Sequence, residues 1–116
     1  MKVERKIDDL INDILNQITK IKKYISGISY EELVQNNEKL DAIIYCLAVI
    51  GEAANKIPKE VQIHHKDIKW RKIISMRNIL VHYYYGADDM VIWKTINNDL
   101  PDLENQILSI KNKSIK

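Results

Sequence analysis

The chain has 116 residues, of which 46% are hydrophobic and 29% charged, an ordinary composition for a globular protein. This length predicts a single domain, residues 1–116, because it is too short for two. Only three glycines and two prolines occur, which argues against the turn-rich chain of an all-β fold. The net charge of +2 is nearly balanced, so the composition neither requires nor excludes a nucleic-acid partner.

The sequence contains no apolar run of about 18 residues, so we expect no membrane span. The first ten residues, "MKVERKIDDL", are too charged for a signal peptide. A single cysteine, Cys46, excludes an intrachain disulfide and fits a reducing compartment. These features predict a cytoplasmic protein.

The first predicted helix covers Val3 to Ser26, where isoleucine, leucine and valine recur at helical spacing. Gly27 ends it. Ser29 and Glu32 then have the spacing of a capping box, which predicts a short helix through about Val34.

A third helix is predicted from Asn37 to Lys56, ending before Pro58. One face is apolar as usual, and Ala42, Cys46, Val49 and Ala53 extend this surface well around the helix. A helix this apolar is buried on more than one side. Because one small domain covers only part of such a surface, we expect a homodimer.

The segment "PKEVQIHHKDI" is expected to connect helices, with at most one helical turn after Pro58. Its adjacent histidines, His64 and His65, lie near Asp67 and invite a metal-site interpretation. Neighbouring residues on a helix point about 100° apart, however, and no further Cys or His stands at a ligand spacing. We therefore predict no metal site and no cofactor.

Two more helical segments complete the chain. One begins near Trp70, and the other follows Asp88 and Asp89, which can cap it. Its apolar positions include Val91, and Pro101 is expected to break or kink it before the pattern continues. The predicted fold is all-α, an up-and-down bundle of four or five helices.

The stretch "RNILVHYYYG" places unusual residues on the helix that begins near Trp70. On a helical wheel Asn78 and His82 are neighbours on the side opposite the apolar arc. Arg77 falls inside that arc, where a charged residue is unexpected, and it is one of only three arginines. In one interpretation Arg77 extends its guanidinium past the apolar stripe into solvent. In the other, the planar guanidinium is needed to bind a carboxylate or phosphate.

Arginine and histidine without a metal cluster suit RNA cleavage. Histidine can accept a proton near neutral pH, and arginine can stabilise charge on a phosphate. Together they could activate a ribose 2′-hydroxyl for attack on the adjacent phosphate. Arg77 and His82 point about 140° apart on one helix, so a two-fold interface that combines two copies would make a more complete site.

Arg77, His82 and Tyr84 match the R-x4-H-x-Y signature of the HEPN superfamily, and the chain more narrowly resembles HepT-type toxins. The segments "IGEAANKIP", "IKWRKIISMRNILVHYYYGAD" and "VIWKTINNDLP" also resemble that family, so the likeness covers about the last 70 residues. The resemblance implies a HEPN-like helical homodimer that cleaves RNA, rather than DNA, without a metal ion.

The resemblance also implies roles for particular residues. Arg77 and His82 would be catalytic, with Asn78 as the usual polar companion. The partner would be a small MNT-type nucleotidyltransferase acting as antitoxin, in some members by attaching AMP to the motif tyrosine, here Tyr84. Tyr83 and Tyr85 flank it, which leaves the modified position open. Glu52 is either an orienting partner of Arg77 or His82, or an ordinary surface glutamate.

Two other functions stay open at this point. The first is a non-catalytic HEPN subunit that binds or presents a substrate to a nucleotidyltransferase. The second is a structural interaction module in which Arg77 forms an interfacial salt bridge. The intact Arg77 and His82 pair favours the ribonuclease toxin, whereas the absence of a strongly basic composition favours the non-catalytic subunit.

Overall fold

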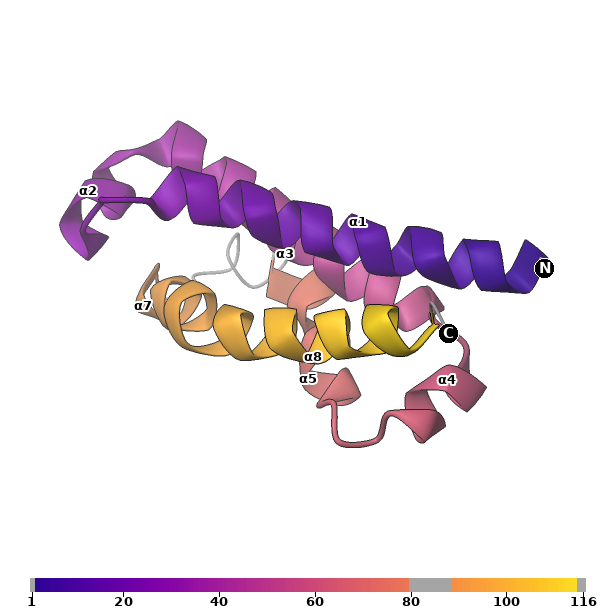
Figure 1. Ribbon diagram of the computed structural model, residues 1–116. Helices are drawn as coiled ribbons and strands as arrows, with labels where there is room; N and C mark the ends of the chain where they lie inside the picture. The colour runs from indigo at the N-terminus through magenta and orange to yellow at the C-terminus, as the bar shows by residue number, and fades with distance from the viewer. Residues whose placement is uncertain (1, 80–88, 115–116) are drawn as a thin grey trace.

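The computed structural model describes residues 2–79 and 89–114, and every regular element in these two ranges is helical (Figure 1). The elements in chain order are α1 (Lys2–Ile25), α2 (Tyr30–Gln35), α3 (Asn37–Lys56), α4 (Lys59–His64), α5 (Trp70–Ile74), η1 (Ser75–Asn78), α7 (Asp89–Lys94), η2 (Thr95–Asp99) and α8 (Leu100–Ser114). The predicted all-α class is confirmed for these residues. No helix in the described ranges is long and apolar enough to cross a membrane.

The first helix and the capping box after it form as predicted. α1 contributes buried isoleucines at helical spacing, and Gly27 follows it at φ +74°, a conformation that favours glycine. The Ser29 hydroxyl accepts the Glu32 backbone N–H at 3.2 Å, and the Glu32 carboxylate accepts the Ser29 N–H at 2.9 Å. This reciprocal pair fixes the start of α2.

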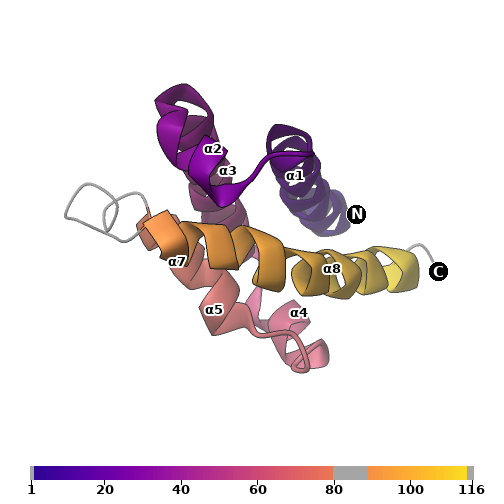
Figure 2. The ribbon, with the colours of Figure 1, turned by 90° about the vertical axis from the view of Figure 1, so that its left-hand side faces the viewer.

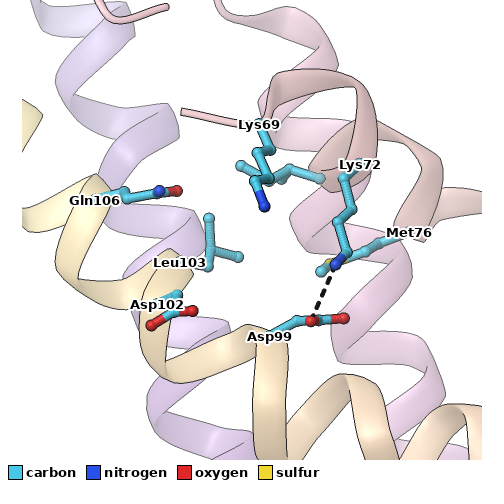
Figure 3. A pocket seen from close by; sticks show the side chains of 8 residues that line it. Lys69, Lys72, Met76, Asp99, Asp102, Leu103 and Gln106 are labelled. Carbon is cyan, nitrogen blue, oxygen red and sulfur yellow. Dashed lines mark hydrogen bonds and ion pairs between the residues drawn. The ribbon is translucent and has the colours of Figure 1, made fainter. Parts of the chain in front are cut away.

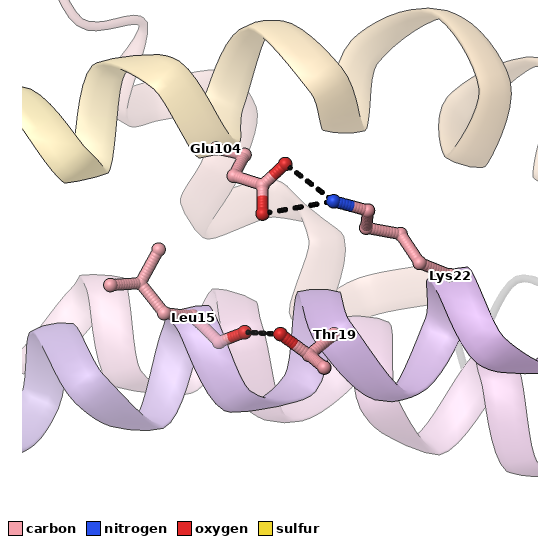
Figure 4. A network of polar contacts seen from close by, with 4 residues as sticks. All are labelled: Leu15, Thr19, Lys22 and Glu104. Atoms are coloured by element: carbon pink, nitrogen blue, oxygen red, sulfur yellow. Dashed lines mark hydrogen bonds and ion pairs between the residues drawn. The ribbon is translucent and has the colours of Figure 1, made fainter.

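α3 is the central helix of the fold. It packs against α1 on one side and against α5 and η1 on another, and α1 in turn contacts α8. In Figure 2 α1 is seen nearly end-on while α8 runs across the view, so these two helices cross obliquely. An exposed ion pair, Lys22 Nζ to Glu104 Oε1 at 3.0 Å, joins α1 to α8 (Figure 4).

The extended apolar surface of α3 is largely covered by the same chain. Cys46 and Ala53, at the back of the predicted face, are 3% and 5% exposed, whereas Tyr45 on the polar strip is 65% exposed. Helices on two sides of α3 therefore bury residues for which a second chain was expected. The homodimer stays a prediction, but the composition of α3 no longer requires it.

The expected connector forms one short helix, α4, and is held to the start of α5 by a tryptophan. The Trp70 indole Nε1 donates to the carbonyls of Gln62 at 3.1 Å and His65 at 3.0 Å. The Gln62 side-chain amide donates to the Ile57 carbonyl at 3.0 Å. These bonds pin the α4 turn, and with it the position at which α5 begins.

Of the two outcomes predicted at Pro101, a break or a kink, the break is wrong: the helical segment continues through Pro101 with a local change of pitch just before it. Proline lacks the N–H that an α-helix uses and clashes with the carbonyl four residues earlier. The backbone accommodates this with a π-helical stretch, η2, in which the Leu100 N–H bonds to the Thr95 carbonyl, five residues back. Ile92, Ile96 and Leu100 stay buried across the change of pitch.

Candidate active site

The backbone at Arg77 lies directly against α3, and a glycine makes this approach possible. A Cβ atom at Gly51 would overlap the Arg77 backbone nitrogen and would lie 2.9 Å from the Ile74 carbonyl oxygen and 3.0 Å from the Arg77 Cα. All three are backbone atoms, which no side-chain rotation can move. Gly51 therefore sets the distance between α3 and the turn that carries Arg77.

The backbone changes from α-helix to 3-10 helix where it packs against Gly51. α5 ends at Ile74 and Ser75–Asn78 form a 3-10 turn, so the α-helix predicted from Trp70 is interrupted here, and the part of the motif after Ile79 lies outside the described residues. A 3-10 turn has 3.0 residues per turn, so positions after Ser75 rotate away from those of an ideal α-helical wheel. Met76, at 4% exposure, is buried on the core side.

Arg77 faces α3 through its backbone, yet its side chain reaches the surface. The side chain is 42% exposed, so the guanidinium passes the apolar stripe and is not enclosed by it. Its Nη1 atom lies 3.6 Å from Oε1 of Glu52, the residue that follows Gly51 on α3. One helix thus contributes both the glycine that seats the Arg77 backbone and the carboxylate beside its side chain.

The ion pair between Arg77 and Glu52 is loose and exposed. At 3.6 Å it exceeds hydrogen-bond distance, and the Glu52 side chain is itself 52% exposed. Exposed pairs of this kind contribute about 0–1 kcal/mol. Among the described residues Glu52 is the ion-pair partner of this guanidinium, and so loose a contact is compatible with bidentate binding of a phosphate by its remaining N–H groups.

Asn78 lies exposed at the end of the same turn and borders a groove between η1 and the α7–η2 segment. We call this the Asn78 groove; its volume is about 250 Å³ and its walls include Ser75, Met76, Asn78, Ile79, Val91 and Thr95. At its end an ion pair joins Lys72 Nζ to Asp99 Oδ1 at 3.0 Å. Figure 3 shows this contact bordering a second, smaller cavity against α8.

The sequence prediction located some of these residues and missed others. Arg77 and Glu52 meet in an ion pair, Asn78 borders a groove on the α7–η2 side, and His82, Tyr83, Tyr84 and Tyr85 lie outside the described residues. The importance of Gly51 was missed, although a glycine inside an otherwise continuous helix is a signal of close packing.

Val91 was predicted to belong to the apolar face of the last helix, which is wrong. It is 55% exposed and borders the Asn78 groove. Ile92 and Ile96, which are four residues apart and share a face, take the core positions instead. A pattern that records only which residues are apolar cannot distinguish an exposed valine from the buried isoleucines next to it.

With this geometry established, the comparisons with known proteins define the class. Residues 14–110 match the family described as "HepT-like: Ribonuclease HepT-like", and the chain belongs to this family. It is 32% identical to "Probable ribonuclease HepT" of Thermococcus cleftensis over 109 residues, which cover 94% of this chain and 99% of the relative. No solved structure is significantly similar to the chain.

Two further relatives have comparable coverage. The chain is 33% identical to "Putative RNase MJ0125" of Methanocaldococcus jannaschii over 107 residues, 92% of each chain. It is 34% identical to "Putative RNase TTE0752" of Caldanaerobacter subterraneus over 103 residues, 89% of this chain and 92% of the relative. The similarity therefore extends along nearly the whole sequence, beyond the motif.

Proposed function

We propose that this protein is an endoribonuclease that cleaves RNA without a metal ion, using Arg77, His82 and Asn78. The observation that carries the proposal is the exposed, loosely paired Arg77 guanidinium on a backbone seated by Gly51, in a member of the HepT-like ribonuclease family. A rigid backbone with an accessible cationic fork suits a site that must hold a phosphate in one orientation.

The reaction divides between the two motif residues. The His82 imidazole accepts the proton of a ribose 2′-hydroxyl, and the 2′-oxygen attacks the adjacent phosphorus. The bond from phosphorus to the 5′-oxygen breaks, and that oxygen leaves with a proton. The products are a 2′,3′-cyclic phosphate and a 5′-hydroxyl. The Arg77 guanidinium stabilises the negative charge that builds on the phosphoryl oxygens.

A homodimer supports this chemistry. Two copies related by a two-fold axis near η1 would place the Arg77 and His82 residues of both chains around one cleft. Such a cleft would present two guanidinium groups to the RNA backbone, with Glu52 beside each. The expected species in solution is therefore a dimer, measurable by sedimentation equilibrium.

We further propose that the protein is the toxin of a two-component system and acts in the cytoplasm. An MNT-type nucleotidyltransferase would silence it by transferring AMP from ATP to the Tyr84 hydroxyl, with release of pyrophosphate. The added adenylate would bring negative charge and bulk close to Arg77 and so obstruct phosphate binding. Co-expression with such an enzyme should relieve growth arrest and add one adenylate to the intact mass, and Tyr84→Phe should prevent the mass change.

The test of the ribonuclease is cleavage by purified protein in the presence of a chelator. Wild type is compared with His82→Ala, Arg77→Ala and the matched control Arg71→Ala, which removes an exposed arginine of α5 outside the motif. We expect wild type and Arg71→Ala to yield cyclic-phosphate ends and both motif variants to lose at least about a hundredfold in rate. Folded wild type that cuts no RNA would favour a non-catalytic subunit that serves a nucleotidyltransferase.

A further inference from the structure

The Asn78 groove borders the proposed catalytic turn, and apart from Asn78 its described lining residues have no role in the reaction given above. Asn78, which immediately follows Arg77, forms part of its wall. The Arg77 guanidinium lies beside Glu52 of α3, whereas the groove lies between η1 and the α7–η2 segment, so the two are on different sides of one short turn. An RNA strand held by Arg77 would pass around this turn for one of its bases to enter the groove.

The groove walls carry apolar side chains and uncharged polar groups. Among the described lining residues the two charged side chains are paired with each other. Met76, Ile79 and Val91 supply hydrocarbon, and Val91 is 55% exposed. The charges at its end, Lys72 and Asp99, neutralise each other across 3.0 Å. A phosphate would find no unpaired cation on these walls, whereas a flat, uncharged ring would cover exposed apolar surface.

The polar atoms on the rim suit the edge of such a ring. The Asn78 amide offers both a donor and an acceptor. The hydroxyls of Ser75 and Thr95 donate to the carbonyls of Lys72 at 2.6 Å and Val91 at 2.8 Å, which leaves their oxygen lone pairs to accept. A volume of about 250 Å³ is below that of most drug-sized pockets and suits one small group.

From these observations we propose that the Asn78 groove binds one nucleobase of the RNA substrate, from a nucleotide near the phosphate held by Arg77. This rests on the proposed ribonuclease function and extends it by assigning a base-recognition site. Bases of single-stranded RNA are commonly recognised by packing of the ring face and by hydrogen bonds to its edge. Base contacts here would both position the strand and bias the choice of cleavage site.

The structure offers closely matched controls. Thr95 and Thr19 each donate their hydroxyl to the carbonyl four residues earlier, Thr95 at 2.8 Å and Thr19 at 3.0 Å, but Thr19 lies on α1 (Figure 4). Val91 and Ile63 are both exposed aliphatic residues, at 55% and 70%, and Ile63 lies on α4. Thr95→Val and Val91→Ala alter the groove, whereas Thr19→Val and Ile63→Ala make the same chemical changes elsewhere.

The experiment is a methyl NMR titration of the intact protein with adenosine, guanosine, cytidine and uridine, with ribose 5-phosphate as the probe without a base. We expect nucleosides to shift the methyl signals of Met76, Ile79 and Val91, and ribose 5-phosphate to leave them in place. Val91→Ala and Thr95→Val should each weaken binding of the preferred nucleoside by about fivefold or more, while the two control variants bind like wild type.

RNA cleavage by the same preparations separates this inference from the proposed function. If wild type cuts RNA, nucleosides shift no groove methyl and the groove variants cut like wild type, the base site is refuted and the ribonuclease stands. If nucleosides bind in the groove but no RNA is cut, the ribonuclease fails, and the groove is a nucleoside-binding site without the proposed role in substrate recognition. Methyl signals that respond to protein dilution and not to nucleosides would assign the groove to a second copy of the chain and overturn the proposal.

Discussion

Replacing Gly51 with alanine should disturb the fold and the proposed reaction through one contact. The new Cβ would overlap the Arg77 nitrogen and stand 2.9 Å from the Ile74 oxygen and 3.0 Å from the Arg77 Cα. Because these are backbone atoms, α3 and η1 must move apart. Overpacking of this kind costs about 1–3 kcal/mol, and the better helix propensity of alanine returns about 0.5–1 kcal/mol.

The clash is with backbone atoms, so we take the upper part of the first range, about 2–3 kcal/mol, and the net loss in the free energy of unfolding is about 1–2.5 kcal/mol. For a domain of this size each kcal/mol lowers Tm by about 4 °C, so Gly51→Ala should melt about 4–10 °C below wild type in a calorimetric scan. A displacement near 1 Å at a catalytic group can reduce the rate about a hundredfold. We expect RNA cleavage at 25 °C to fall by between about ten- and a hundredfold although the protein is still folded.

Gly27→Ala is the control for destabilisation alone. Gly27 has φ +74° and no atom within 4 Å of a built Cβ, so alanine there suffers backbone strain without a clash. The cost of this left-handed conformation is about 1–2 kcal/mol, comparable with that of Gly51→Ala. We expect a similar fall in Tm but unchanged cleavage. Equal cleavage by Gly51→Ala and wild type, or equal impairment in the two glycine variants, would refute the role of Gly51 in seating Arg77.

Three further predictions concern residues outside that contact. Ser29→Ala removes one half of the capping box and should lower the free energy of unfolding by about 1 kcal/mol in urea titrations, and an unchanged midpoint would contradict this. Glu52→Gln should alter stability by less than about 1 kcal/mol because the pair is exposed, yet lower the cleavage rate if Glu52 restrains Arg77; an ordinary surface glutamate would leave the rate unchanged. Burial raises the pKa of the Cys46 thiol, against a smaller opposing effect of Lys20, so stability from the neutral thiol is present at neutral pH and lost as pH rises through the raised pKa. A disulfide reagent should accordingly modify Cys46 slowly in native protein and quickly in denaturant, and equal rates would show that the thiol is accessible.

The parts of the fold that depend on local sequence could be predicted. The bounds of α3, the capping box at Ser29 and the end of α1 at Gly27 follow from periodicity and from residues whose side chains or backbone freedom act within one turn. These signals need no knowledge of the neighbouring helices. They were sufficient to place Arg77 and Glu52 on two helices of one small bundle.

The parts of the fold that depend on packing between helices could not be predicted from the sequence. The 3-10 turn at Ser75–Asn78 lies where the Arg77 backbone packs against Gly51 of α3. These two residues are 26 positions apart in the sequence, so the contact is tertiary. The π-helical stretch before Pro101 keeps Ile96 and Leu100 buried, which an isolated helix has no reason to do. The Asn78 groove likewise follows from no local motif, since its walls come from two separate segments, η1 and α7–η2.

The most direct test of the account is to remove a single 2′-oxygen from the substrate. An RNA oligonucleotide is first cut by the wild-type protein with chelator present, and the cleavage site is mapped. A second oligonucleotide carries one 2′-deoxynucleotide on the 5′ side of that phosphate. We predict that this substitution abolishes cleavage at the site and that the unmodified RNA yields a 2′,3′-cyclic phosphate. Continued cleavage of the deoxy-substituted strand at that phosphate would contradict attack by the 2′-hydroxyl, and with it the roles assigned to Arg77 and His82.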